Sequence, residues 1–290
     1  MASLTVTAPD GRALEVDLNG PEDGDLVVHH TGTPQAGILF SGFVQAGAER
    51  GLRHVAYSRP GYASSDRQPG RTVADCTSDV TAIADQLGVE RFFVVGTSGG
   101  GPHALACAAL LGDRVKAAAS IAGVAPRDAE DLDWMAGMGA ENVEEFGAAE
   151  AGEEDLRAWL EDHGAEFAKA TGPELHAALG DLLSEVDKSV LTGEFAEYLA
   201  QSARRGLEHG VWGWFDDDLA FCREWGFDLA SMACPVSIWQ GGQDRFVPYA
   251  HGEWLASHVA GADAQLHAAH GHLSLAIGAY GDVLDWLLAV

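Results

Sequence analysis

The sequence has few basic side chains: 17 Lys and Arg stand against 44 Asp and Glu in 290 residues, which gives a net charge of −27. Such a surface repels the phosphates of nucleic acids and anionic lipids, so we expect neither nucleic acid nor a membrane as partner. The four cysteines form no CxxC pair, and their placement relative to the histidines indicates no zinc site. No signal-peptide pattern begins the chain, and no apolar run approaches the roughly 18 residues of a membrane helix. We therefore expect a soluble, cytoplasmic protein.

The acidic residues are concentrated in the middle of the chain. Residues 126–218 contain 24 acidic and 6 basic side chains, a net charge of −18, whereas the other 197 residues contain 20 and 11, a net charge of −9. A solvated helical surface accounts for this excess better than a site that traps cations. The same segment is rich in Ala, Glu and Leu at helical spacing and has no convincing strand. It predicts an all-helical cap inserted into the rest of the chain.

The sequences on either side of this segment alternate between short apolar runs and helical patterns. Residues 4–8 and 13–18 flank a Pro9-Asp10-Gly11 turn and predict an edge hairpin. Six further runs are typical of strands covered on both faces: 26–29, 54–58, 92–95, 117–121, 236–239 and 264–267. Helices are predicted over 72–87 and 102–111. This alternation predicts an α/β fold with a mostly parallel sheet, whose core comprises residues 1–125 and 219–290.

The sharpest chemical signal is the segment FFVVGTSGGGP, residues 92–102, which contains a GxSxG motif. The motif lies where a buried strand turns into a helix, which is the structural context in which GxSxG indicates a nucleophilic serine. Gly96 and Gly100 let the two backbones approach, so the turn can hold Ser98 in a strained conformation with its hydroxyl exposed. The N–H groups at the start of the helix face any oxyanion formed there. Ser98 is therefore a candidate nucleophile, and the alternative is a glycine-rich turn with an idle serine.

A serine nucleophile needs a base that a carboxylate orients, and both residue types follow predicted strands later in the chain. Asp244 comes shortly after the run 236–239, and His272 lies in a loop after the run that ends at His267. The order Ser, Asp, His along the chain agrees with the alpha/beta-hydrolase arrangement.

Together these motifs resemble an alpha/beta-hydrolase-fold serine hydrolase with a helical cap, and the resemblance covers nearly the whole chain. It implies that Ser98 is the nucleophile, His272 the general base and then acid, and Asp244 the carboxylate that orients the histidine. The family's base directly follows a glycine, here Gly271, which favours His272 over the alternative His270. The resemblance implies no metal and no organic cofactor.

In this family a second oxyanion donor comes from the loop after an early strand. Here that loop reads HHTGTP over 29–34 and resembles the family's His-Gly-x-Pro segment, with Thr31 in place of the histidine. The resemblance implies an oxyanion hole made by the backbone N–H groups of Thr33 and Gly99. Arg59 lies in a segment that resembles the family's Arg-Gly-Tyr-Gly loop, and we interpret it as a structural anchor. His103 is interpreted as a packed histidine.

Large apolar side chains gather where the chain enters and leaves the cap. Trp134 and Met138 lie at one crossing, and Trp212 and Trp214 lie at the other. Above a catalytic serine such side chains form an apolar acyl pocket, although packing of the cap against the core explains each of them singly. We expect the four residues collectively to line the substrate site.

The leading functional hypothesis is hydrolysis of an ester or similar small acyl compound through a Ser-His-Asp triad and an acyl-enzyme, by a monomer or homodimer. Serine rather than aspartate at position 98 argues against epoxide hydrolysis and dehalogenation. Two alternatives stay open. One is a proline-iminopeptidase-like aminopeptidase, with which an acid-rich cap is compatible although that family's loop motifs are absent. The other is a ligand-binding, non-catalytic member of the fold.

Overall fold

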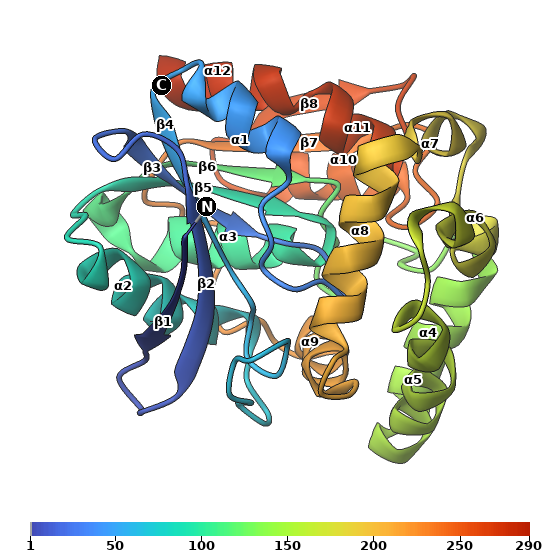
Figure 1. Ribbon diagram of the computed structural model, residues 1–290. Helices are drawn as coiled ribbons and strands as arrows, with labels where there is room; N and C mark the ends of the chain where they lie inside the picture. Colours follow the sequence, from blue (N-terminus) through green and yellow to red (C-terminus); the bar gives the residue numbers. More distant parts are fainter. Residues whose placement is uncertain (1) are drawn as a thin grey trace.

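The computed structural model describes residues 2–290 and contains an eight-stranded sheet with the order β1-β2-β4-β3-β5-β6-β7-β8 (Figure 1). The strands are β1 (Ala2–Thr7), β2 (Ala13–Asn19), β3 (Asp25–His30), β4 (Leu52–Tyr57), β5 (Phe92–Thr97), β6 (Val115–Ile121), β7 (Val236–Gly241) and β8 (Asp263–His267). β1 and β2 form the predicted antiparallel hairpin, β2 also pairs antiparallel with β4, and the remaining pairs are parallel. The predicted α/β fold with a mostly parallel sheet is confirmed.

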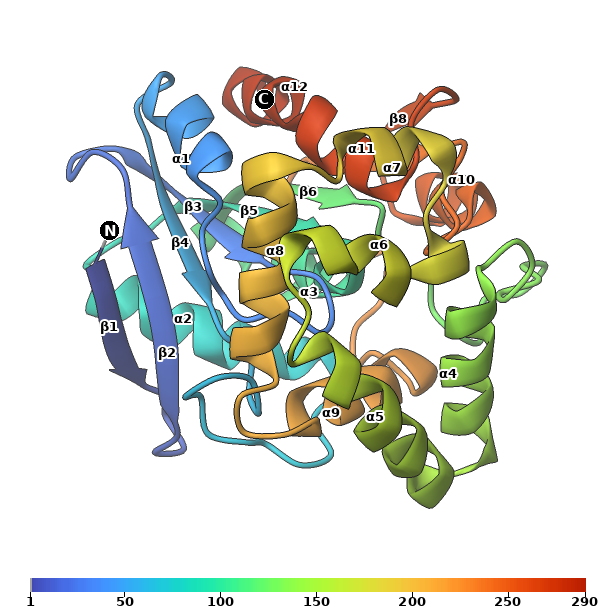
Figure 2. The same ribbon diagram turned by 45° about the vertical axis from the view of Figure 1, so that its right-hand side comes forward.

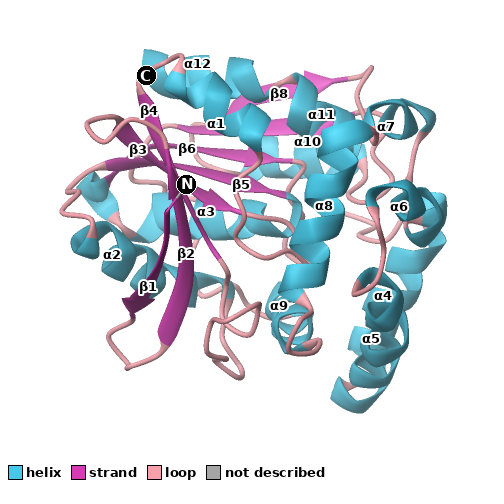
Figure 3. Cartoon of the chain, viewed as in Figure 1, coloured by secondary structure: helices cyan, strands magenta, loops and turns pink. Residues whose placement is uncertain are grey.

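Helices cover both faces of this sheet. One face carries α1 (Ser41–Ala48), α11 (His272–Gly278) and α12 (Tyr280–Ala289), and the other carries α2 (Cys76–Gln86), α3 (Gly101–Leu110) and α10 (Tyr249–His258) (Figure 3). Successive side chains of β5 alternate between the two faces, so Phe92 and Val94 belong to the core beneath α2 and α3, and Phe93 and Val95 to the core beneath α12. This double burial is the reason that the central strands read as continuous apolar runs.

Short 3₁₀ helices complete the core and the cap: η1 (Val73–Asp75), η2 (Ser98–Gly100), η3 (Gly112–Arg114), η4 (Gly172–Glu174) and η5 (Gly180–Leu182). The helix predicted over 72–87 begins as η1, where the Asp75 carboxylate accepts the N–H of Thr72 at 2.6 Å, and continues as α2. It ends before Gly88, whose left-handed φ of 68° does not continue a helix. Within residues 2–290 every helix is too short or too polar to span a bilayer.

Six helices lie between β6 and β7: α4 (Ala140–Ala151), α5 (Glu153–Phe167), α6 (Leu175–Ala178), α7 (Glu185–Val190), α8 (Gly193–Gly206) and α9 (Trp212–Cys222). They gather on the side of the molecule away from β1 and β2, beyond the ends of the central strands (Figure 2). These helices occupy the segment for which a helical cap was expected, and α9 continues to Cys222, past the expected boundary at residue 218. The division into a core and a cap stays a prediction.

Candidate active site

Ser98 lies at the sharp turn between β5 and α3, in the left-handed backbone region with a φ of 55°. Two glycines make this turn possible. A Cβ at Gly96 would lie 2.1 Å from the carbonyl oxygen of Gly100, and a Cβ at Gly100 would lie 2.0 Å from the carbonyl oxygen of His30. Because these neighbours are backbone atoms, the strand and the helix approach to a distance that only glycine allows. The surroundings thus hold Ser98 in its unfavourable conformation.

Asp244 and His272 form a buried hydrogen-bonded pair. Asp244 follows β7, and its Oδ2 lies 2.7 Å from Nδ1 of His272, the first residue of α11. Its Oδ1 accepts the backbone N–H groups of Phe246 and Val247 at 2.9 and 2.8 Å. The carboxylate is therefore fixed in place and directs the Nδ1 proton of the imidazole toward itself, which leaves Nε2 able to accept a proton.

The pKa of the histidine reflects burial and charge acting in opposite directions. Burial lowers the pKa of His272, but the charge and hydrogen bond of Asp244, with a contribution from Asp187, outweigh this effect and leave the pKa above its ordinary value. Burial raises the pKa of Asp244, and the interaction with His272 offsets only part of that rise. A general base with a raised pKa takes a proton more readily, so this pair is suited to proton transfer.

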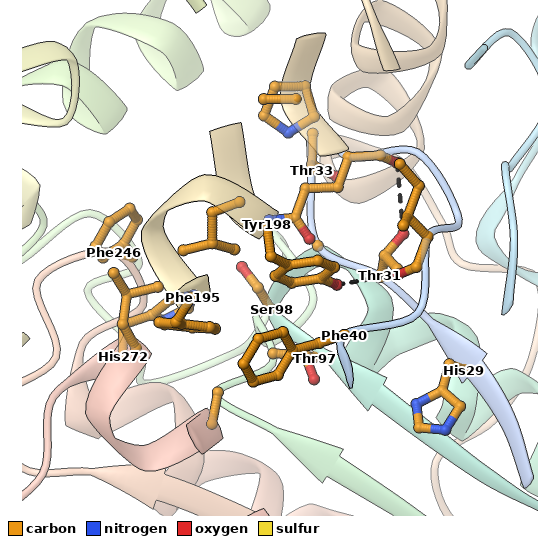
Figure 4. A pocket seen from close by; sticks show the side chains of 18 of the residues that line it. His29, Thr31, Thr33, Phe40, Thr97, Ser98, Phe195, Tyr198, Phe246 and His272 are labelled. Atoms are coloured by element: carbon orange, nitrogen blue, oxygen red, sulfur yellow. Dashed lines mark hydrogen bonds between the residues drawn. The ribbon is translucent and has the colours of Figure 1, made fainter. Parts of the chain in front are cut away.

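Ser98 and His272 line the same cavity, which has a volume of about 1020 Å³. Figure 4 shows Ser98 in the middle of this cavity, with His272 and the rings of Phe195 and Tyr198 around it. No hydrogen bond joins the hydroxyl of Ser98 to the imidazole in the described chain, whereas Nδ1 of the alternative base, His270, lies 3.2 Å from a backbone carbonyl. Catalytic hydrogen bonds are often long without substrate, and rotation about a single side-chain bond moves a serine hydroxyl.

Thr33 and Gly99 lie against each other beside the serine. A Cβ at Gly99 would come within 2.5 Å of the Thr33 hydroxyl, and a Cβ at Gly32 within 3.3 Å of the Cβ of Ser98. Within residues 2–290 neither the N–H of Thr33 nor that of Gly99 donates to a turn or loop carbonyl. Both N–H groups are thus available next to the serine, as stabilisation of an oxyanion requires.

A buried ion-pair network holds the loop that carries Thr33. Asp217 of α9 pairs with Arg59 and, at 2.7 Å, with Arg71, and it accepts the hydroxyl of Thr33 at 2.7 Å. Arg59 also donates to the carbonyl oxygen of Thr31. Burial would raise the pKa of Asp217, but the two arginines outweigh it and hold the pKa well below its ordinary value. Arg59 therefore fixes the loop that carries Thr33, and the carboxylate that completes this contact comes from a helix expected in the cap.

Sequence reasoning missed a second cap carboxylate, Asp187 of α7, which contacts the start of α11. Its two oxygens accept the backbone N–H groups of His272 at 3.0 Å and of Ser274 at 2.8 Å, and it is completely buried. Ser184 donates to the same carboxylate at 2.8 Å. No pattern in the sequence singles out Asp187, because it is one of 24 acidic residues between positions 126 and 218.

A second cavity, of about 770 Å³, adjoins the first beside the serine. Of the four cap side chains expected to line the substrate site, Trp214 lines this second cavity. The structure corrects the expectation for the other three. Trp134 and Met138 are buried in the main hydrophobic core, and Trp212 packs on the guanidinium group of Arg67 at 4.1 Å. Their rings and sulfur serve packing because they face the core or the surface rather than the cavity.

One cluster of possible metal ligands occurs in the part of the chain that the structure describes: His30, Cys76 and Cys107, all buried. Burial raises the pKa of the Cys76 thiol well above its ordinary value, which disfavours the thiolate that binds a metal. The thiol of Cys107 lies 3.6 Å from Nε2 of His30. We assign these three side chains to the packing beneath the serine turn.

Residues 25–275 match the family model of the alpha/beta hydrolase fold, so the chain belongs to this family. It is 31% identical over 111 residues to 3-oxoadipate enol-lactonase 1 of Acinetobacter baylyi, a match that spans 36% of this chain and only 38% of that protein. It is 23% identical over 266 residues to the uncharacterized hydrolase YcgS of Bacillus subtilis, which covers 91% of this chain and 89% of that one. The family and these relatives identify the protein as a hydrolase.

Solved structures show the same fold at low sequence identity. An esterase from Thermogutta terrifontis has a TM-score of 0.70 at 18% identity, with 100% of this chain and 99% of that chain covered. An enol-lactonase from Burkholderia xenovorans has a TM-score of 0.64 at 18% identity, with 99% and 100% covered. The likeness extends over the whole chain, including the helices between β6 and β7.

Proposed function

We propose that the protein is a serine hydrolase that cleaves a small ester or a similar acyl compound. The observation that carries this proposal is that His272 lines the same cavity as the strained Ser98 and is hydrogen-bonded, behind it, to the buried Asp244. A serine hydroxyl becomes a useful nucleophile when a neighbouring base removes its proton. A histidine whose other nitrogen is held by a carboxylate is such a base.

In the proposed reaction Ser98 Oγ attacks the acyl carbon while Nε2 of His272 takes the hydroxyl proton. The backbone N–H groups of Thr33 and Gly99 donate to the oxyanion of the tetrahedral intermediate, and Asp244 stabilises the imidazolium. The imidazolium then gives its proton to the leaving oxygen, the acyl C–O bond breaks and an acyl-enzyme forms. Water attacks this ester with His272 again as base, which releases the acid and restores the serine.

The lining of the first cavity supports a substrate with an apolar portion. Phe40, Phe195, Leu199 and Leu273 belong to one hydrophobic cluster and line this cavity. Similar proteins are named as an esterase and as enol-lactonases, and these names support an acyl C–O bond as the bond that is broken.

Covalent labelling tests the nucleophile. We expect the wild type to form an adduct with a fluorophosphonate probe and Ser98→Ala to form none, because the probe traps an activated serine. Ser64→Ala, at an exposed serine, is the matched control and should keep the label. A folded wild type that stays unlabelled would contradict the proposal and favour a ligand-binding protein of the same fold.

Two chromogenic substrates separate an esterase from an aminopeptidase. We expect turnover of p-nitrophenyl butyrate and no turnover of proline p-nitroanilide. Loss of the ester activity in Ser98→Ala assigns it to this site. Turnover of the amide alone would overturn the proposed reaction and favour the aminopeptidase.

A further inference from the structure

Two buried carboxyl groups lie in the wall of the second cavity and take no part in the proposed reaction. Glu145 comes from α4 and Asp218 from α9, and the same cavity is lined by Ser98 and Gly99. Glu145 is 7% exposed and Asp218 is 0% exposed. A carboxyl group is rarely buried this far without a partner of opposite charge.

Neither of these carboxyl groups is paired with a lysine or an arginine in the described chain. Oε1 of Glu145 accepts the indole N–H of Trp214 at 2.6 Å, and Glu145 lies within hydrogen-bonding reach of Asp218. Both oxygens of Asp218 lack any N–H or hydroxyl donor within the described chain. No Lys or Arg of residues 2–290 forms an ion pair with either group. The preceding residue, Asp217, is by contrast paired with two arginines.

Both carboxyl groups have a raised pKa. Burial raises the pKa of Glu145 to about 7, although hydrogen bonds from Trp214 and Asp218 and the nearby His163 act in the opposite direction. Burial and the charge of Glu145 raise the pKa of Asp218 well above its ordinary value. Burial therefore disfavours the ionised form of both groups, and ionisation of one makes ionisation of the other more costly.

The rest of the cavity wall around the pair is largely aromatic. The rings that line it are those of Phe146, Trp159, Phe167, Trp214, Phe221 and Phe246. His163 also lines it and stacks on Trp159 at 3.8 Å, with Nδ1 bound to the Trp159 carbonyl at 2.9 Å. Glu141, at the edge of the wall, accepts a backbone N–H at 3.0 Å. A cation in this cavity would meet both carboxyl groups and the faces of aromatic rings.

We propose that Glu145 and Asp218 form a binding subsite for a protonated primary amine carried by the substrate. This inference rests on the proposed function, since the reacting acyl group lies at Ser98 while the amine occupies the second cavity. An ammonium group supplies three N–H donors and one positive charge, whereas the pair receives the indole N–H of Trp214 at Glu145 and has no Lys or Arg partner. A hydroxyl group supplies one donor and no charge, so it leaves the pair's negative charge uncompensated.

Binding of an amine also changes the protonation of the pair. A positive charge beside two carboxyl groups favours their ionised forms, so binding at neutral pH releases protons to the buffer. A pair that serves only as a structural contact between α4 and α9 binds no amine and releases none. Proton release is therefore a second readout, independent of affinity.

The experiment compares n-butylammonium with 1-butanol, which match in chain length and size. Calorimetric titration of Ser98→Ala at pH 7 measures binding without turnover, and inhibition of p-nitrophenyl acetate hydrolysis by the wild type measures competition at the site. We expect butylammonium to bind at least about tenfold more tightly than butanol, because it gains hydrogen bonds to charged groups. The heat of its binding should vary with the ionisation enthalpy of the buffer.

Two single variants and their combination test the two carboxyl groups, and a third single variant serves as the control. Glu145→Gln keeps an acceptor for the Trp214 indole, and Asp218→Asn keeps the side-chain volume, so each is expected to remain folded and to lose the preference for the amine. Glu144→Gln, at an exposed acid of the same helix, should keep it. Equal binding of the two probes to Ser98→Ala, or a preference that persists when both acids are replaced, would overturn the subsite. If the protein binds butylammonium but hydrolyses no ester, the proposed function is refuted and the amine subsite is not.

Discussion

The site has two halves, which use buried carboxyl groups differently. The sheet half consists of Ser98, Asp244 and His272, and the cap half consists of the side chains on the helices between β6 and β7. On the sheet side, Asp244 holds the imidazole of His272 with one oxygen and accepts two backbone N–H groups with the other. On the cap side, Asp187 accepts backbone N–H groups, Asp217 pairs with arginines, and Asp218 has another acid beside it. Burial is common to all four aspartates, so it assigns no role by itself. The donors and charges around each acid decide whether it orients a base, holds a loop or stays open to a ligand.

The sheet half is tested most severely by removal of the base. We expect His272→Ala to lower kcat for a p-nitrophenyl ester by about 10⁴-fold or more, because Ser98 loses the group that takes its proton. His270→Ala, the matched control, should leave kcat within about threefold, since this ring contacts a backbone carbonyl. Steady-state kinetics check both values. An equal loss of kcat in His272→Ala and His270→Ala would contradict the assignment of His272 as the base.

The cap half is tested by two adjacent aspartates with opposite surroundings. Asp217→Ala leaves Arg59 and Arg71 buried without their counter-charge, so we expect the free energy of unfolding to fall by about 3–5 kcal/mol. Asp218→Asn replaces a buried acid that has a raised pKa and no Lys or Arg partner with an amide of similar volume, so the change should stay within about 1 kcal/mol. Denaturant unfolding at pH 7 measures both. A similar loss of unfolding free energy in Asp217→Ala and Asp218→Asn would show that the different partners of the two aspartates do not affect stability.

Asp187 connects the two halves, and its removal should affect the rate more than the binding of substrate. Asp187→Ala leaves the N–H of His272 without its acceptor, and we expect kcat to fall about 10–100-fold with little change in KM. Glu185→Ala, at an exposed acid of the same helix, should have no such effect.

The pH profile separates positioning of the histidine from a general structural loss. Since the charge of Asp187 contributes to the raised pKa of His272, Asp187→Asn should lower that pKa. Activity requires the deprotonated imidazole, so the midpoint of the acid limb of kcat/KM should move to lower pH. An unmoved midpoint would show that Asp187 acts on stability alone.

The smallest expected effect concerns the dependence of stability on pH. The pKa of Glu145 is raised from 4.5 to about 7 in the folded protein, so the native state binds more protons than the unfolded state in that window. The free energy of unfolding therefore falls as the pH rises from about 5 to 8, and Glu145→Gln should reduce this fall by roughly 1–2 kcal/mol. Glu144→Gln should leave it unchanged. Unfolding curves at several pH values measure the difference, and identical profiles would contradict the shift.

The sheet half of the site could be predicted largely from the sequence. Buried parallel strands are continuous apolar runs, and the tight turn at Ser98 requires the glycines that make its motif recognisable. The choice of His272 over His270 came from a resemblance, and the structure places His272 beside Asp244. Whether these residues carry out catalysis stays a prediction.

The cap half could not be predicted in the same detail. Trp212 was misplaced because the side of a cap helix that faces the cavity depends on packing between helices. Trp134 and Met138 lie in the irregular segment before α4, whose path no periodicity in the sequence predicts. The sequence did indicate that an acid of the run Asp216 to Asp218 is buried. Apolar residues flank this run on both sides, so a helix that packs them inward must bury at least one of the three carboxyl groups. The sequence does not show which of these acids meets an arginine, since the arginines come from a loop 140 or more residues earlier.

The contacts of Asp187 and Asp217 have a consequence for protein engineering. These two side chains tether the inserted helices to His272 and to the loop that carries Thr33, respectively. A chimera that received the corresponding helices of another hydrolase would acquire a new pocket but lose both tethers. If the proposed reaction holds, a productive graft has to restore a carboxylate at both positions.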